Sequence, residues 1–169
     1  SLTPDRAREE VFSEFRNTVL YPPVAYVPAV LGILASRALG LTVLEALYVS
    51  RAAYLLVCLL LLYGTLRVLG PGEKRKLGIL CLAGMPMTAF LVPSVNGDAL
   101  SISLSFLVVG LGLRLGDAWS DGRFAAFLAA TALLALCKPP TFLVALMVLP
   151  ALASSDATRS VKALRLLLV

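Results

Sequence analysis

The chain has 169 residues, of which 59% are hydrophobic and 15% charged, and its mean hydropathy is +0.91. Soluble domains are roughly 45–50% apolar and about 25% charged, so this composition indicates an integral membrane protein without room for a separate soluble catalytic domain. The net charge of +5 does not indicate nucleic acid as a partner, because the basic residues form short clusters beside apolar runs, where membrane topology explains them.

The first 40 residues divide into a polar stretch and an apolar segment that contains prolines. Residues 1–20 are charged and mixed, and the start signal Thr3-Pro4 predicts a short amphipathic helix. Residues 21–40 include Pro28 and Arg37, and their apolar part has about 17 residues, the lower limit for crossing a bilayer. The residues leave two alternatives open: this segment crosses the membrane, or it lies along the outer interface.

Five longer apolar runs follow, and each predicts a membrane-spanning helix. They are residues 46–69, 77–93, 98–115, 123–137 and 141–153, and the last ten residues begin a sixth. We expect Pro86 to be tolerated inside the second run, because neighbouring helices can hydrogen-bond the carbonyl that it frees. The predicted fold class is all-α, a polytopic transmembrane helical bundle. Because the chain starts at Ser1 without Met and stops within an apolar run, we expect a partial chain of a longer protein.

Lysine and arginine are distributed unequally between the two sides that these spans define. One side carries nine of them and the opposite side carries Lys138 alone. The nine are Arg67, Lys74, Arg75, Lys76, Arg114, Arg123, Arg159, Lys162 and Arg165. Because Lys and Arg are retained in the cytoplasm, loops 70–76, 114–123 and 154–162 are predicted to be cytoplasmic. Loops 93–98 and 138–141 are predicted to be exoplasmic.

The loop at residues 93–98 contains an amide and a carboxylate, Asn96 and Asp98. A carboxylate at the start of a helix can cap free N–H groups and meets the positive end of the helix dipole, which explains Asp98 without a functional role. The same pair could instead hold a sugar hydroxyl, or Asp98 could coordinate a divalent metal ion. The sequence leaves both interpretations open.

Basic and aromatic residues near the predicted exoplasmic side are further candidates for binding. Lys138 precedes Pro139-Pro140 at a helix end, where its ammonium could bind a lipid phosphate or extend to the headgroups. Arg51 lies about one and a half turns inside the first span, so we expect it to face the bundle or an outer cavity. Tyr21 and Tyr26 could form one wall of a substrate groove or anchor the chain at the interface.

Four segments of the chain share a recognisable pattern: "NTVLYPPVAYVPAVLGILASRALGL", "YVSRAAYLL", "MPMTAFLVPSVNGDAL" and "CKPPTFLVALMVLP". In this order they resemble the marks of the DUF2142 family of predicted multispanning bacterial membrane proteins, over roughly residues 17–152. That family is similar to the GT-C glycosyltransferases, which use polyprenyl-phosphate-linked sugars. The resemblance favours residues 1–40 as an exoplasmic loop with juxtamembrane helices, and residues 41–169 as a GT-C-like bundle in the bacterial plasma membrane.

The resemblance implies a GT-C-type glycosyltransferase that moves a sugar from a polyprenyl-phosphate donor to a glycan or lipid acceptor on the outer face. Its catalytic carboxylate would lie upstream of Ser1, so no catalytic residue is assigned here and the fragment is expected to be inactive alone. The substrate-binding candidates are Tyr21, Tyr26, Arg51, Asn96, Asp98 and Lys138, and Asp98 is the candidate metal ligand.

Two other classes of function compete with the enzyme. A transporter or assembly subunit for envelope polysaccharide would use the same outward polar groups to bind a passing substrate without catalysis. A purely structural membrane protein is the third hypothesis.

Overall fold

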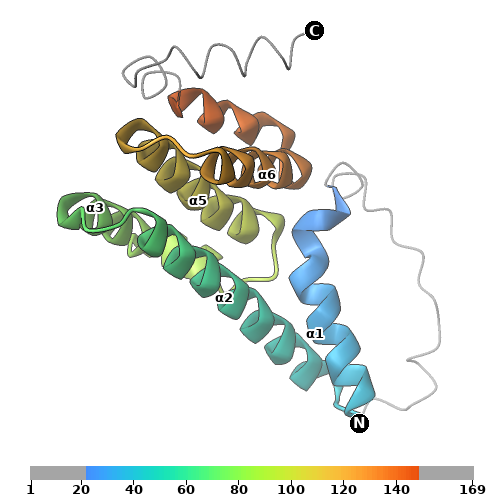
Figure 1. The fold of residues 1–169 in the computed structure, drawn as a ribbon. Helices are drawn as coiled ribbons and strands as arrows, with labels where there is room; N and C mark the ends of the chain where they lie inside the picture. The colour runs from blue at the N-terminus through green and yellow to red at the C-terminus, as the bar shows by residue number, and fades with distance from the viewer. Residues whose placement is uncertain (1–21, 149–169) are drawn as a thin grey trace, which may run out of the picture.

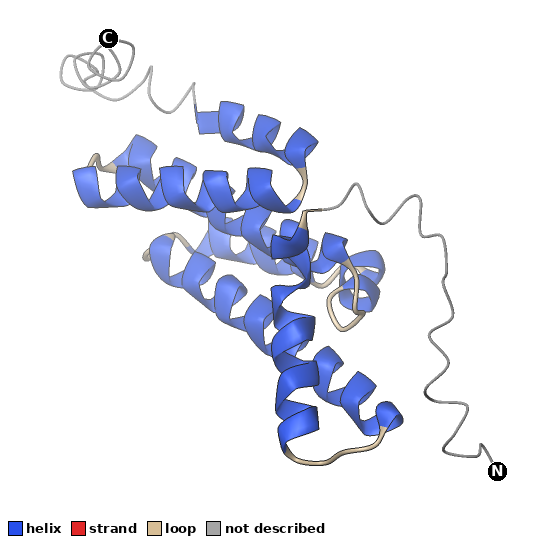
Figure 2. Ribbon diagram, turned by 90° about the vertical axis from the view of Figure 1, so that its right-hand side faces the viewer, coloured by secondary structure: helices blue, strands red, loops and turns tan. Residues whose placement is uncertain are grey.

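The computed structural model describes residues 22–148, and these residues form helices joined by turns and short connections (Figure 2). In chain order the elements are η2 (Pro23–Tyr26), α1 (Val27–Ala38), α2 (Val43–Val68), α3 (Glu73–Ala83), α4 (Pro86–Leu91), α5 (Gly97–Asp117), α6 (Asp121–Cys137) and η3 (Pro139–Val148), with η2 and η3 being 3-10 helices (Figure 1). The predicted all-α fold class is confirmed. Tyr21, the loop 154–162 and the sixth apolar run lie outside the described residues.

Helices α2 and α5 pack side by side and run parallel. The Cys58 thiol of α2 donates to the carbonyl oxygen of Ala99 at the start of α5, with 3.6 Å between sulfur and oxygen. Farther along, a methyl group placed on Gly110 of α5 would lie 2.9 Å from Cγ2 of Thr65. The contacts therefore advance in the same direction along both helices. Because parallel neighbours need a return connection, residues 69–96 run back from the C-terminal end of α2 to the N-terminal end of α5.

Helix α6 runs antiparallel to α5 and brings the chain back to the end where α5 begins. The short connection at residues 118–120 joins the two helices, and η3 then packs against both of them (Figure 1). The buried core lies between α2, α5 and α6, where apolar side chains meet. Its largest contributors include Tyr54, Leu104, Val108, Leu111, Leu115, Phe127 and Leu134. This arrangement places residue 138 beside residues 97–101.

Helix α1 and the N-terminal part of α2 form a hairpin that extends beyond the start of α5 (Figure 1). The turn has Gly40 at φ +66°, and Thr42 then caps α2 through a reciprocal capping box with Glu45. The two helices cross closely at Gly32, where a methyl group would lie 2.6 Å from the Cα atom of Ser50. Only glycine allows this backbone-to-backbone approach.

Two helices of the described range, α2 and α5, are long and apolar enough to cross a membrane. They correspond to the predicted spans 46–69 and 98–115. Helix α1 has 12 residues, or about 18 Å of helix, which is much less than roughly 30 Å of hydrocarbon. Helix α6 has 17 residues, about 26 Å. Because η2 continues directly into α1, the apolar helical segment is Pro23–Ala38, and both predicted alternatives for residues 21–40 stay open.

The prediction of one continuous helix over residues 77–93 is wrong. The structure has two helices instead, α3 and α4, separated at Gly84 and Met85. Proline disfavours the helical conformation of the residue before it, and Met85 accordingly has an extended ψ of 139°. Pro86 then occupies the first turn of α4, where its missing N–H costs no hydrogen bond.

Proline also determines the end of α6, as the sequence predicts. The helix ends at Cys137, and the backbone of Lys138 is extended with φ −153° and ψ 101°. The following helix starts at Pro139 rather than at residue 141, and its described part to Val148 is a 3-10 helix. The predicted span 141–153 is thus described only in part.

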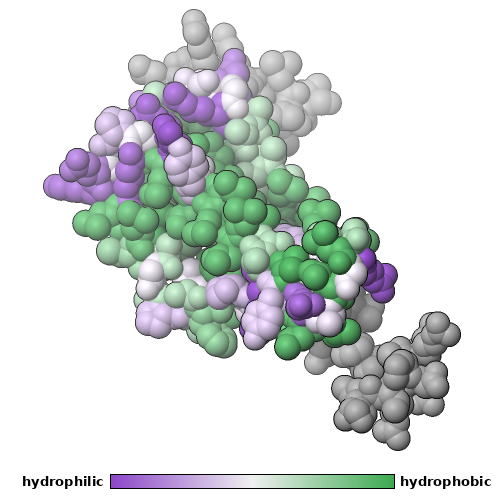
Figure 3. All heavy atoms as spheres, turned by 90° about the horizontal axis from the view of Figure 1, so that it is seen from below, coloured by the Kyte–Doolittle hydropathy of each residue, from purple (hydrophilic) through white to green (hydrophobic). Residues whose placement is uncertain are grey.

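The surface is largely apolar, as expected for a protein in contact with lipid. Large hydrophobic side chains are exposed on α1, α2 and α4, among them Leu31 at 59%, Leu56 at 60% and Phe90 at 74%. In Figure 3, hydrophobic side chains cover the middle of the visible face, and hydrophilic ones lie at the upper left with smaller groups at the lower right.

We expect Gly32→Ala to destabilise the α1–α2 hairpin, because the new methyl group would meet the backbone of Ser50. Overpacking of this kind costs about 1–3 kcal/mol, and it should lower the midpoint of thermal unfolding of the full-length protein in detergent. Gly64→Ala in α2 is the matched control, since its methyl group would meet nothing within 4 Å. The control should be neutral or stabilising by up to about 1 kcal/mol. Equal midpoints for the two variants would contradict the close crossing.

Candidate polar site at the N-terminal end of α5

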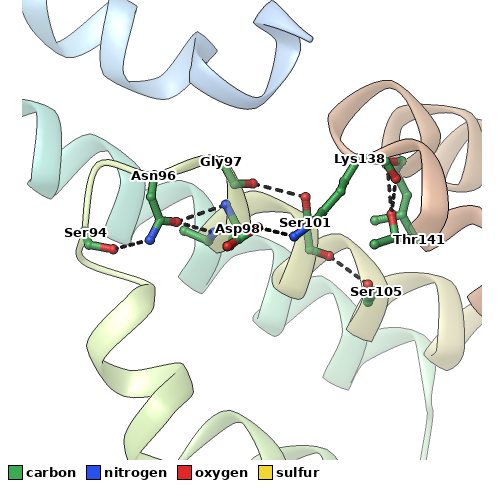
Figure 4. Close-up of polar contacts among 10 residues, drawn as sticks. Ser94, Asn96, Gly97, Asp98, Ser101, Ser105, Lys138 and Thr141 are labelled. Carbon is green, nitrogen blue, oxygen red and sulfur yellow. Dashed lines mark hydrogen bonds and ion pairs between the residues drawn. The ribbon is translucent and has the colours of Figure 1, made fainter. Parts of the chain in front are cut away.

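Asn96, not Asp98, caps helix α5. Its side-chain oxygen accepts hydrogen bonds from the backbone N–H groups of Asp98 at 3.0 Å and Ala99 at 2.9 Å (Figure 4). Its amide nitrogen donates to Ser94 Oγ at 2.8 Å, and that hydroxyl donates to the carbonyl of Leu91 at 2.5 Å. The predicted capping role of Asp98 is therefore wrong, because the preceding amide already satisfies these N–H groups. The Asp98 carboxylate is left available for a partner outside its own helix.

That partner is Lys138. Its ammonium nitrogen lies 2.7 Å from Asp98 Oδ1, although the two residues are 40 positions apart in the sequence (Figure 4). The side chains of Lys138 and Asp98 are 36% and 44% exposed, so the pair is partly open to its surroundings. The structure thus joins two of the sequence-predicted site residues in one ion pair. It forms where α5 begins and α6 ends.

The backbone around Lys138 is fixed by hydrogen bonds on both sides. Its N–H donates to the carbonyl of Leu134 at 3.0 Å and completes the last turn of α6. Its carbonyl accepts from the Thr141 backbone N–H at 3.0 Å and from the Thr141 hydroxyl at 2.6 Å. The base of the long lysine side chain is therefore held in place, which reduces the freedom of its ammonium beside Asp98.

Tyr26 lies against the turn that carries Asn96 and Asp98. A methyl group placed on the buried Gly97 would be 3.8 Å from the Tyr26 hydroxyl oxygen and 3.4 Å from Cβ of Ala25. The buried Tyr54 hydroxyl of α2 donates to the carbonyl of Ala25 at 2.5 Å and fixes this segment to the bundle. Tyr26 is thus positioned beside the turn that carries Asn96 and Asp98, and its role as a wall of a substrate groove stays a prediction.

The structure does not bring Arg51 into this cluster. Arg51 is exposed, and within residues 22–148 no hydrogen bond or ion pair joins it to another side chain. It lies seven residues before Cys58, close to two helical turns and therefore on the same face of α2, about 10 Å along the helix axis. Because Cys58 contacts Ala99, Arg51 lies beyond the start of α5, on the projecting hairpin.

The residues around Asp98 do not fit a divalent metal ion. The neighbouring amide oxygen of Asn96 already accepts two backbone hydrogen bonds, and the Asp98 carboxylate faces a lysine ammonium. Calcium and magnesium sites need several oxygen ligands from the protein or from water. Among the residues that the structure describes, no group of three His, Cys, Asp or Glu side chains could hold a metal ion. We therefore derive no chemical step through a metal.

The arrangement suits recognition of a polar, anionic group. A lysine ammonium has three N–H donors and acts toward phosphate as a point charge. The Asp98 carboxylate accepts a hydrogen bond from this ammonium and keeps it oriented. The carboxylate and the serine hydroxyls of the first turns of α5 add acceptors. Ser101 and Ser105 are shown nearby in Figure 4, although their hydroxyls donate to the carbonyls of Gly97 and Ser101.

Three supporting residues lie outside the predicted substrate-binding set. Ser94 holds the Asn96 amide, Thr141 holds the backbone of Lys138, and Tyr54 anchors the segment before α1. The preference for asparagine at a helix N-cap could have identified Asn96 as the cap. No comparable signal exists for Tyr54 and Thr141, because their partners are backbone carbonyls determined by the packing of helices.

Comparison with known proteins gives one match. The sequence model of a family described as "Predicted membrane protein (DUF2142)" matches residues 1–169. No curated protein and no solved structure matches the chain.

We expect a measurable coupling between Asp98 and Lys138 in a double-mutant cycle. Asp98→Asn and Lys138→Met should each lower the stability of the full-length protein in detergent. The double variant should lose less than the sum of the two, by about 1 kcal/mol or less because the pair is partly exposed. The measurement is the thermal or denaturant midpoint of the three variants and the wild type. Strict additivity would contradict the pairing.

Proposed function

Since this chain belongs to the DUF2142 family of predicted membrane proteins, we propose that it forms part of a membrane glycosyltransferase of the GT-C type. The enzyme transfers a sugar from a polyprenyl-phosphate donor to a glycan or lipid acceptor. The described residues contribute to binding the donor, and the base that activates the acceptor lies elsewhere in the protein. The chain is placed in the bacterial plasma membrane, with loops 93–98 and 138–141 on the outer face.

The Asp98–Lys138 pair is the observation that carries this proposal. A lipid-linked donor presents a phosphate beside a sugar, and the pair presents a cation beside a carboxylate at one end of two apolar helices. The ammonium would attract the phosphate, and the carboxylate would accept hydrogen bonds from sugar hydroxyls. Tyr26 contributes an aromatic surface next to Gly97, where a sugar ring could stack.

The reaction needs stabilisation of the departing phosphate. The oxygen of the acceptor hydroxyl forms a bond to the anomeric carbon, and the bond from that carbon to the phosphate oxygen breaks. The polyprenyl phosphate leaves with the electron pair, and the hydroxyl proton passes to the base outside this chain. Lys138 stabilises the negative charge that develops on the phosphate, an electrostatic contribution that is often the largest in such reactions. Arg51 lies nearer the N-terminal end of α2, away from the Asp98–Lys138 pair. We therefore assign it to binding the lipid phosphate as it approaches rather than to this step.

We expect Asp98→Asn and Lys138→Ala to abolish sugar transfer in the full-length protein. The assay follows labelled sugar from a polyprenyl-phosphate donor into product in membranes, with membrane abundance measured in parallel. Asp121→Asn and Lys76→Ala are matched controls, because they remove one carboxylate and one ammonium at the opposite end of the bundle. The controls should keep normal activity.

Full activity in both site variants would overturn the site assignment. If the intact protein binds the donor through Lys138 but transfers no sugar, the proposed transferase activity is overturned. It would favour the transporter or assembly subunit instead.

The proposed orientation predicts which cysteines an impermeant thiol reagent can label from outside the cell. Pro140 and Ala118 are both exposed, and they lie at opposite ends of α6. In a background with the exposed Cys81 replaced by serine, Pro140→Cys should be labelled and Ala118→Cys should not. The buried Cys58 and Cys137 remain as internal controls. The reverse labelling pattern would show the opposite orientation.

A further inference from the structure

The end of the bundle opposite Asp98 contains an open hollow of about 610 Å³. The turn after α2, the first turn of α3 and the last turn of α5 form its walls. Its lining residues are Leu69, Pro71, Gly72, Glu73, Lys74, Arg75, Arg114 and Asp117. Three of these side chains are cationic and two are carboxylates. The nearly fully buried Leu69 makes part of the floor apolar.

Two of the cations in this hollow differ in how they are engaged. Arg75 donates to Asp117 through both terminal guanidinium nitrogens, with Nη2 at 3.1 Å from Oδ1. This hydrogen bonding raises the pKa of Arg75 above its ordinary value. Arg114 has no hydrogen-bond acceptor among the described residues, and its nearest carboxylate oxygen is Asp117 Oδ2 at 4.0 Å. Arg75 therefore neutralises Asp117, and Arg114 keeps donors available for another anion.

The turn at Gly70 holds the Arg114 guanidinium in place. Gly70 has φ +67°, and a methyl group there would lie 3.6 Å from Cζ of Arg114. The guanidinium thus packs over the bare backbone of the turn and remains 28% exposed. A positioned, planar guanidinium with open donors is well suited to a phosphate group.

The start of α3 adds favourable electrostatics from the other wall. Gly72 occupies the N-cap position, and no side chain caps the N–H groups of the first turn. Free N–H groups and the helix dipole favour an anion there. Lys74 adds a mobile positive charge in the same turn, partly offset by Glu73.

A second hollow of about 430 Å³ adjoins the first and shares Glu73 and Lys74 with it. Lys76, Leu77 and Leu80 line its continuation along α3, and the two leucines are 62% and 45% exposed. A polar recess therefore leads directly to an apolar strip of helix. A free inorganic anion would use only the first part, whereas a phospholipid could use both.

We propose that these two hollows form a binding site for an anionic glycerophospholipid. The phosphodiester binds Arg114, Lys74 and the N-terminal turn of α3, and an acyl chain lies along Leu77 and Leu80. Asp117 stays paired with Arg75, so it does not oppose the phosphate with a full negative charge. The site is at the opposite end of the bundle from Asp98 and does not depend on the proposed transferase activity.

The test measures lipid binding to the full-length protein in detergent by native mass spectrometry. The ligands are phosphatidylglycerol, phosphatidylcholine and inorganic phosphate, each in titration. We expect saturable binding of phosphatidylglycerol, weakened about tenfold by Arg114→Gln and by Lys74→Gln, because each removes a charged hydrogen bond to phosphate. Arg67→Gln is the matched control: Arg67 lies near the same end, but its guanidinium donates to Tyr63 at 2.7 Å outside the hollow.

Three outcomes would overturn the proposal. Equal affinity for phosphatidylcholine and phosphatidylglycerol would show that the site does not select an anionic lipid. An equal effect of Arg67→Gln and Arg114→Gln would show general attraction to a basic surface. Competition by inorganic phosphate at the same concentration would show that the lipid chain contributes nothing. Should Arg114→Gln reduce expression, the exposed Lys74 provides the folded variant that decides the result.

Discussion

The close parallel contact between α2 and α5 determines where the polar residues of this chain can meet. Small groups line it: Gly110 faces Thr65, and the buried Ser103, which lies near Cys58, returns its hydroxyl to the carbonyl of Ala99 in its own helix. Without protruding side chains the helices approach closely, so dispersion contacts and packing can hold them together in a lipid environment. The parallel direction then requires residues 69–96 to return along the bundle before α5 starts.

This connectivity separates the charged residues into two groups with different surroundings. At one end, α6 returns Lys138 to Asp98, and the pair remains partly exposed. At the other end, the turn after α2 places Arg75 and Arg114 beside Asp117. Each group contains a carboxylate that orients a cation, but only the second combines its cations with an uncapped helix start. The two ends of α5 therefore carry two polar regions that differ in their charges and surroundings.

Much of the helical organisation follows from the sequence, because long apolar runs and proline positions have few alternatives. The runs that became α2 and α5 and the stop at Cys137 were predicted within a few residues. The break at Met85 was not, because tolerance of Pro86 depends on neighbours that the sequence does not specify. The capping error at Asp98 has a similar cause, because Asn96 and Asp98 could both serve as the cap and local geometry selected Asn96. Loop charges suggested sidedness but could not show that Asp98 meets Lys138.

The Asp98–Lys138 pair lies beside the middle of α2 rather than beside the start of that helix. Ala99 contacts Cys58, which lies fifteen residues after the first residue of α2, or about 22 Å along its axis. The α1–α2 hairpin therefore extends well beyond the Asp98–Lys138 pair and stands beside it as a wall with exposed apolar side chains. Next to such a wall the effective dielectric constant is lower than in open water, which strengthens the attraction of the pair for a charged headgroup.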